Sequence, residues 1–386
     1  MGIYLSHLSA LRYWRSVGHP RVIGAGLSCE IARALGRPSG TARIRRIPEG
    51  PPDVALVRDV AGRAFAGVGD VGATFGAGTT DDVRDASAAE PLHVLVARNE
   101  DRRPSRGIVC HALGADLPSG SLVRLASPDV YVSSPGLCLI QLAATLPDVE
   151  LTLLACEFCG MYGPSRAVPH GLFGRTPLSS VASLRTYASK ASHLKGCRRV
   201  RLCLAHALDR SASPMESILA LSQCLPMRRG GAGLPAPLLN HRVELTPEAR
   251  LHCGKRHFVY DLHWPGLNVA AEYDSDAAHA LDPQRDNDSV RRAIIQAMGE
   301  QVVTVRTNQL FDPQLMADVT KALERAMGLY RRERVADYGA RRERLYRELL
   351  APWTHPERPS LFGPRALACP QPAGWRAPGA VGRGRP

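Results

Sequence analysis

The most constraining stretch of this sequence is FVYDLHWPGLNVAAEYD, residues 258–274. Apolar and polar residues alternate on both sides of the central Trp264–Leu267 segment, which is the pattern of two β-strands joined by a tight turn. Proline at the second and glycine at the third position of that segment are typical of a type II turn. Asp261, Glu272 and Asp274 lie in these strands at positions where burial disfavours charge. The stretch therefore predicts a hairpin whose carboxylates serve chemistry rather than packing.

The expected register of the hairpin brings two of these acids together. With a two-residue loop, Trp264 pairs with Leu267, and Asp261 then lies opposite Ala270. Glu272 becomes the diagonal neighbour of Asp261 on the same face, about 7–8 Å away. Carboxylates at that spacing repel one another, whereas Mg²⁺ or Mn²⁺ is held by one or two carboxylates together with a substrate phosphate. The hairpin therefore predicts a metal site for phosphodiester chemistry, in which the ion polarises the phosphate and activates a water.

The sequence around the hairpin predicts a mixed α/β domain. Helical periodicity flanks the hairpin, and two more stretches alternate as strands, which gives the expected order α-β-β-β-α-β-α. Shorter patterns upstream predict a small α+β module whose strands form an antiparallel set. The expected fold class is therefore α/β (α+β), with a C-terminal mixed sheet flanked by helices. The expected parts are a poorly defined, disordered N-terminal region in residues 1–90, the module in 91–210, the domain in 211–334, a charged helix in 335–350 and a disordered tail in 351–386.

Charge and cysteine content narrow the function classes only in part. The formal charge of +13 favours a polyanionic partner, with DNA first, although a bias toward Arg, Ala, Gly and Pro explains the charge equally well. The sequence contains no apolar run of 18 or more residues, and its N-terminus does not resemble a secretory signal, so we expect a cytoplasmic protein. Cys156 and Cys159 form a single C-x-x-C without a second close pair. This pattern favours buried helix residues over a zinc site.

The segment from residue 213 to residue 310 resembles the DUF559 domain of the restriction-endonuclease-like, or PD-(D/E)xK, superfamily, and it is similar to the very-short-patch mismatch repair branch. The resemblance is carried by SPMES, LNHRVEL, the hairpin and DNDSVRRAIIQAMGEQVVTVRTNQL. It implies that Asp261 and Glu272 bind the metal and that Glu216 of the preceding helix joins them. Asp274 stands where many members have lysine, and the resemblance implies His279 as the residue that serves in place of that lysine. Ser275 stands where the family has glycine.

An upstream segment resembles a second family. The stretches LPSGSLVRLASPDVYVSSPGLCLIQLA and LACEFCGMYG look like the middle region of AbiEi-type proteins, which are antitoxin-like components of abortive-infection systems. This resemblance implies a toxin as a partner. Such chains usually begin with a winged helix, and residues 1–90 do not show its pattern.

Several candidate residues also have purely structural explanations. Ser213, Pro214 and Glu216 match a helix N-cap, its first residue and its third residue, so Glu216 can act as a capping residue alone. Asp274 can end its strand, and His279 can be a solvated loop residue. In addition, Arg291 and Arg292 can contact DNA phosphates or form surface ion pairs, and Gln309 can contact DNA or cap a turn.

These observations predict a metal-dependent DNA endonuclease, or a domain derived from one, in a defence or toxin–antitoxin context. The alternative is a non-catalytic, DNA-binding, antitoxin-like regulator that retains the nuclease scaffold. A third interpretation is a decayed or purely structural protein, which the unusual composition of residues 22–90 favours.

Overall fold

The computed structural model describes residues 2–18, 37–65, 91–103, 107–127, 129–164, 172–274, 285–329 and 335–354. His279 and residues 355–386 of the predicted tail lie outside these ranges, so the predictions made for them stay predictions. Residues 351–354, which were predicted to begin the disordered tail, are helical. The chain divides into two compact units. The first comprises Met1–Phe158 and Tyr162–Ala205, and the second comprises Cys159–Met161 and His206–Pro386.

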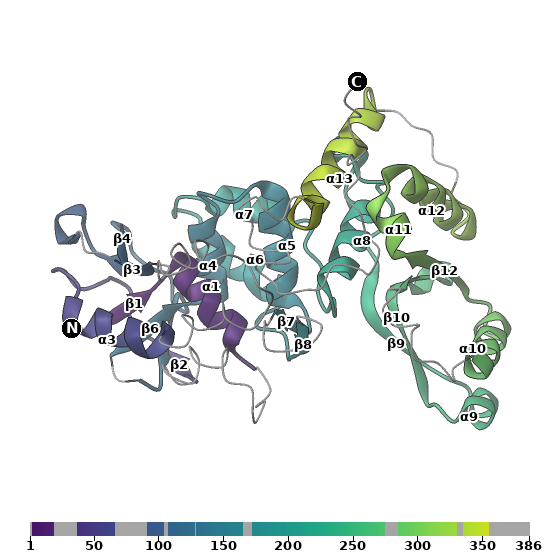
Figure 1. Ribbon diagram of the computed structural model, residues 1–386, viewed down its shortest axis with the longest axis horizontal. Helices are drawn as coiled ribbons and strands as arrows, with labels where there is room; N and C mark the ends of the chain where they lie inside the picture. Colours follow the sequence, from purple (N-terminus) through teal and green to yellow (C-terminus); the bar gives the residue numbers. More distant parts are fainter. Residues whose placement is uncertain are drawn as a thin grey trace, which may run out of the picture. The chain divides into compact units, whose positions relative to one another are not determined.

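The first unit is built on a six-stranded mixed sheet in the order β2-β5-β6-β1-β3-β4 (Figure 1). β1 pairs in parallel with β6 and antiparallel with β3, and β3 pairs in parallel with β4. The predicted antiparallel set is therefore wrong for β3 and β4, which pair in parallel. In addition, β1 from the N-terminus inserts between β6 and β3 and separates these two strands. The strands are β1 (Ile3–Leu5), β2 (Pro38–Thr41), β3 (Leu92–Val96), β4 (Ile108–Ala112), β5 (Leu122–Leu125) and β6 (Val130–Ser133), with a separate pair of β7 (Tyr162–Pro164) and β8 (Leu172–Gly174).

Helices complete the first unit. Helix α1 buries Tyr13 completely, and the indole N–H of Trp14 donates to the carbonyl oxygen of Ser133 at 2.7 Å, which ties α1 to β6. Cys156 and Cys159 are fully buried in α5, which confirms the prediction that they are packed helix residues. The helices are α1 (His7–Ser16), α3 (Val54–Phe65), α4 (Pro135–Leu142), α5 (Asp148–Cys159), α6 (Val181–Lys190) and α7 (Cys197–Leu204), together with the 3₁₀ turn η2 (Asn99–Asp101).

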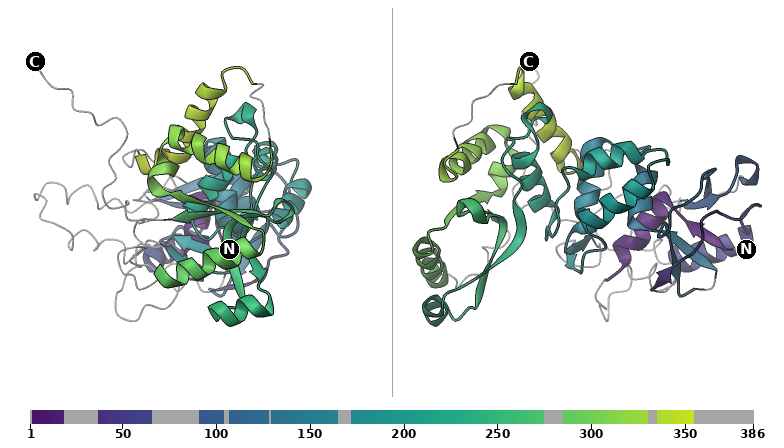
Figure 2. Two further views of the ribbon diagram at one scale, coloured as in Figure 1. Left: turned by 90° about the vertical axis from the view of Figure 1, so that its right-hand side faces the viewer. Right: turned by 180° about the vertical axis from the view of Figure 1, so that it is seen from behind.

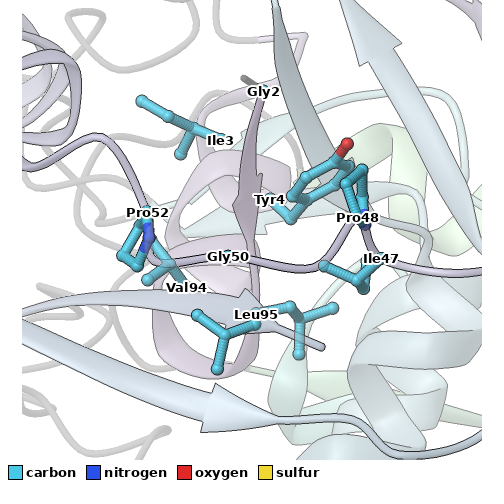
Figure 3. Close-up of a pocket in the computed structure, with 10 residues that line it drawn as sticks. Gly2, Ile3, Tyr4, Ile47, Pro48, Gly50, Pro52, Val94 and Leu95 are labelled. Carbon is cyan, nitrogen blue, oxygen red and sulfur yellow. The ribbon is translucent and has the colours of Figure 1, made fainter. Parts of the chain in front are cut away.

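A small pocket lies beside β1 and β3 in the first unit (Figure 3). Ile3 and Tyr4 of β1, Leu95 of β3 and the loop residues Ile47 and Pro48 contribute to its lining. Its lining residues include no carboxylate, imidazole or thiol, so the pocket offers none of these groups for catalysis.

The second unit contains a four-stranded sheet in the order β12-β11-β10-β9. β9, β10 and β11 are antiparallel neighbours, whereas β11 and β12 are parallel. Helices α10 and α12 lie on opposite sides of this sheet (Figure 2, left). The elements are α8 (Pro214–Cys224), η3 (Met227–Arg229), β9 (Leu238–Glu244), α9 (Pro247–Cys253), β10 (His257–Trp264), η4 (Pro265–Leu267), β11 (Val269–Asp274), α10 (Arg285–Ala297), β12 (Gln301–Arg306), α11 (Thr307–Phe311), α12 (Pro313–Ala326) and α13 (Tyr338–Thr354).

This arrangement confirms the expected α+β fold class and the mixed sheet flanked by helices. The predicted order of elements is present, with two further short helices, α9 between β9 and β10 and α11 between β12 and α12. Local signals explain α9: the Thr246 hydroxyl accepts from the N–H of Ala249, Pro247 follows the cap, and Gly254 ends the helix at φ +67°.

Helix α13 belongs to the second unit. Leu345, Tyr346 and Leu349 of this helix are almost completely buried, and α13 packs against α8 and η3. Gly230 follows η3 at φ +91°, and a Cβ there would meet the carbonyl oxygen of Arg341 at 2.2 Å. Only glycine therefore permits this close approach.

The turn of the hairpin differs from the expected type II turn. Pro265–Leu267 forms a 3₁₀ turn, and Asn268 adopts the left-handed conformation at φ +53°, so the loop has four residues instead of two. As a result Trp264 pairs with Val269, two residues later than predicted. A shift by two residues keeps the same faces but changes which side chains are opposite each other.

Among the residues that the structure describes, no helix has both the length and the apolar character needed to cross a membrane.

Candidate functional site

Asp261 lies in β10 at the centre of the predicted carboxylate site. Its neighbour Leu262 pairs with Ala271, so continuing the pairing by one residue sets Asp261 opposite Glu272. The expected pairing of Asp261 with Ala270 is therefore wrong, and the two acids are closer in register than predicted. The Oδ2 atom of Asp261 accepts a hydrogen bond from the backbone N–H of Tyr273 at 2.8 Å.

The surroundings of Asp261 favour its neutral form. Burial raises its pKa to about 7, and the negative charges of Glu216 and Glu272 act in the same direction. The hydrogen bond from Tyr273 and the positive charge of Arg291 oppose this shift only in part. A carboxyl group whose pKa is raised by burial and by neighbouring acids is a feature of functional sites, and a bound cation would reverse the unfavourable electrostatics.

Glu216 combines a capping role with a place near Asp261. Its backbone N–H donates to the Ser213 hydroxyl oxygen at 3.2 Å, and its side chain accepts from that hydroxyl at 3.0 Å and from the N–H of Ala212 at 2.8 Å. The side chain is buried, which raises its pKa despite these hydrogen bonds. The structural interpretation of Glu216 is thus correct, and its negative charge also contributes to the raised pKa of Asp261.

Asn240 is a site residue that the sequence reasoning missed. Its Nδ2 group donates to Oε2 of Glu216 at 2.6 Å and to the carbonyl oxygen of Arg210 at 3.0 Å. Asn240 has φ +46° in the middle of β9, a conformation that asparagine tolerates better than most residues. An asparagine in a predicted strand was the available signal, because asparagine is a poor strand former.

Glu272 is paired with a cation from the protein itself. The guanidinium of Arg291 donates through Nη1 to Oε2 at 2.7 Å and through Nη2 to Oε1 of the same carboxylate. This guanidinium also lies over the rings of Phe258 and Tyr260, with 5.2 and 5.9 Å to the ring centroids. The hydrogen bonds from Arg291 to Glu272 raise the pKa of Arg291. The sequence left open whether Arg291 contacts DNA phosphates or forms an ion pair, and in the structure it forms an ion pair with the site carboxylate.

The remaining predicted site residues lie around this group or outside it. Asp274 is the last residue of β11 and lies opposite Arg306 of β12. Arg292 is exposed on α10. Gln309 accepts a hydrogen bond from the N–H of Arg306 at 2.9 Å, so its capping interpretation is correct.

The carboxylates match a hard metal ion in chemistry but not in the arrangement observed. Oxygen donors such as those of Glu216, Asp261 and Glu272 suit Mg²⁺ or Mn²⁺. Within the described ranges, however, no group of three or more His, Cys, Asp or Glu side chains is placed to hold a metal ion. Both oxygens of Glu272 accept hydrogen bonds from Arg291.

A second group of polar residues in this unit was also missed. Nδ1 of His241 lies 2.7 Å from Nδ1 of His263, and Nε2 of His263 lies 3.3 Å from both carboxylate oxygens of Glu300. His263 is buried, and its ring lies 5.0 Å from that of Tyr260. Since a carboxylate accepts hydrogen bonds, Nε2 of His263 carries a proton, and the proton between the two histidines then belongs to His241.

The first unit contains a separate cluster of three histidines. The ring of His7 stacks on that of His111 at 3.5 Å between centroids, and Nδ1 of His93 lies 2.9 Å from Nε2 of His111. Burial lowers the pKa of all three, to about 3 for His7 and about 4 for His111. His7 has φ +48°, a strained conformation for this residue type.

Comparisons with known proteins do not assign the chain to a family. No protein-family model matches it, and neither a curated protein nor a solved structure matches it. The two family resemblances in the sequence therefore stay predictions.

Proposed function

We propose that the second unit is a DNA endonuclease that depends on Mg²⁺ or Mn²⁺ and acts in the cytoplasm as part of a defence or toxin–antitoxin system. One observation supports this proposal above the others. The carboxylates of Glu216, Asp261 and Glu272 come from three different elements, α8, β10 and β11, and burial, together with the charges of Glu216 and Glu272, raises the pKa of Asp261 to about 7. Carboxylate oxygens are the ligands that suit a divalent cation of this kind.

In this proposal each residue has a definite task. Asp261 and Glu272 would hold the ion, and Glu216 would supply a further oxygen. A bound ion would neutralise charge on a phosphodiester and lower the pKa of a water. Arg291 and Arg292 of α10 bind phosphate oxygens. Asp274 and His279 remain candidates for moving the proton from the attacking water.

The element order also supports the proposal. The chain runs from α8 through β9, β10 and β11 to α10 and β12, and β11 and β12 are parallel while the hairpin strands are antiparallel. This is the order that helical and strand periodicity predicted for the segment that resembles restriction-endonuclease-like domains. Fold alone does not define an activity, so the argument rests on the carboxylates.

The test is a nicking assay on supercoiled DNA with the full chain and Mg²⁺ or Mn²⁺. We expect cleavage that EDTA abolishes, and a decrease of at least about 100-fold in the Asp261→Asn variant. Asp318→Asn is the matched control, since Asp318 is exposed on α12 and paired with Lys321. Equal cleavage by the Asp261 variant and the wild type would rule out the proposed site.

A second candidate function is a non-catalytic DNA-binding regulator with a toxin protein as its partner. The Arg291–Glu272 ion pair favours it, because a carboxylate already neutralised by the protein needs no metal. The regulator would bind DNA in a salt-dependent manner. It would not cleave DNA, whichever divalent ion is added. Binding that survives the double change Asp261→Asn and Glu272→Gln, without cleavage by the wild type, would establish this function in place of the first.

A further inference from the structure

Glu272 is a proposed metal ligand, but in the structure its carboxylate is paired with Arg291. Both terminal nitrogens of the guanidinium donate to the two carboxylate oxygens, an arrangement that is among the strongest hydrogen-bonded ion pairs in proteins. Both oxygens of Glu272 therefore accept hydrogen bonds from the arginine. A divalent ion has to compete with Arg291 for this carboxylate, because the bidentate contact already neutralises its charge.

The surroundings permit Arg291 to leave this position. The side chains of Arg291 and Glu272 retain 27% and 21% of their exposure, so solvent or a ligand can reach both. The guanidinium lies over the rings of Phe258 and Tyr260. These contacts are cation–π contacts, which are weaker than an ion pair. The neighbouring residue on α10, Arg292, is exposed and adds a second positive charge next to the pair.

We infer that Arg291 is an internal substitute for the metal ion, and that a DNA phosphate draws it away from Glu272 so that the carboxylate becomes a metal ligand. The inference rests on the proposed function, whose site it describes. A phosphate group accepts the same bidentate donation that Glu272 accepts, so the exchange replaces one anion by another. Metal binding without DNA is then weak, and DNA and the divalent ion each strengthen the binding of the other by the same factor.

This coupling is measured through metal binding rather than cleavage. Mn²⁺ is titrated into the full chain, with and without a DNA duplex that has non-hydrolysable phosphorothioate linkages, and free Mn²⁺ is followed by electron paramagnetic resonance. For the wild type we expect DNA to tighten Mn²⁺ binding by about tenfold or more. For Arg291→Gln we expect Mn²⁺ binding without DNA to be about as tight as that of the wild type with DNA, and the effect of DNA to be small.

A matched control separates the contact from the loss of one positive charge. Arg242→Gln removes an exposed arginine from β9 in the same sheet, and Arg242 contacts Glu244 rather than the site. We expect it to keep the DNA dependence of the wild type. Arg291→Lys keeps the positive charge but loses the bidentate contact, so without DNA it should bind Mn²⁺ more tightly than the wild type. It also serves as a second variant if circular dichroism shows that Arg291→Gln does not fold.

Three outcomes overturn the inference. If both Arg291 variants bind Mn²⁺ no more tightly than Arg242→Gln, Arg291 does not block the site. If DNA tightens Mn²⁺ binding equally in the wild type and in Arg291→Gln, Arg291 again does not block the site. After either result, the proposed function still holds if the wild type nicks DNA with Mn²⁺. If neither the wild type nor any variant binds Mn²⁺ or cleaves DNA, both the proposed function and the inference are rejected.

Discussion

The side-chain amide of Asn240 donates to Oε2 of Glu216 at 2.6 Å, and this bond ties β9 to the first turn of α8. Replacing Asn240 by alanine leaves the buried Glu216 carboxylate with one donor fewer and keeps a Cβ at φ +46°. We expect Asn240→Ala to lower the free energy of unfolding by about 1–3 kcal/mol, measured by urea denaturation.

Asn240→Gly separates the two causes of that loss. It also removes the hydrogen bond, but glycine accepts the left-handed conformation, so it should be more stable than Asn240→Ala by about 1 kcal/mol. Equal stabilities of the two variants would show that the backbone conformation at this position carries no cost.

Asp261 gives the second unit a pH dependence of known sign. Its folded pKa of about 7 lies above the ordinary value of about 3.9, so between these values the folded state binds more protons than the unfolded state. Stability contributed by this group is therefore present at low pH and is lost as pH rises through 7. We expect Asp261→Asn to stabilise the protein by about 1–3 kcal/mol at pH 8 and by much less at pH 4, measured by urea denaturation without divalent ions. A stabilisation independent of pH would contradict the raised pKa.

The buried pair of Arg15 and Glu157 holds α1 against α5 in the first unit. Nε and Nη2 of Arg15 donate to the two carboxylate oxygens at 2.8 and 2.7 Å, and the Glu157 side chain is completely buried. Arg15→Ala leaves this buried carboxylate without its cation, so we expect a loss of about 3–5 kcal/mol in thermal or urea unfolding. The exposed pair of Arg344 and Glu348 provides the comparison, since Arg344→Ala should cost less than about 1 kcal/mol.

The three stacked histidines make the first unit sensitive to acid. The folded pKa values of about 3 for His7 and about 4 for His111 lie below the ordinary value of about 6.5, so the unfolded chain binds more protons in this window. Stability is therefore complete above about pH 6.5 and decreases as the pH falls toward 4.

Substitution of one ring tests this dependence. We expect His111→Asn to flatten the decrease in stability between pH 6.5 and 4, while the exposed histidine variant His193→Asn leaves it unchanged. The measurement is the melting temperature across this pH range. An unchanged profile in His111→Asn would show that the cluster does not govern acid sensitivity.

Much of the second unit could be predicted from local signals. Ser213 followed by proline marks the start of α8, and alternation of apolar residues marks β10 and β11. The same reasoning identified Asp261 and Glu272 as neighbouring acids, because aspartate and glutamate in apolar strands need an explanation other than packing.

The details of the site could not be predicted in this way. The register of the hairpin depended on the conformation of Pro265–Leu267 and on φ +53° at Asn268, which a Pro-Gly pair does not reveal. The role of Arg291 depended on how α10 packs against the sheet. Position along the chain does not show whether an arginine turns toward a carboxylate or toward solvent.

The sequence by itself determined the kinds of elements, their order in the second unit and the two acids on the hairpin, because these follow from capping residues and from periodicity within a few residues. Only the tertiary structure decided that β1 enters the middle of the first sheet, that Asn240 holds Glu216 and that Arg291 neutralises Glu272. These contacts join residues far apart in the chain, and their formation depends on the packing of whole elements rather than on local preference.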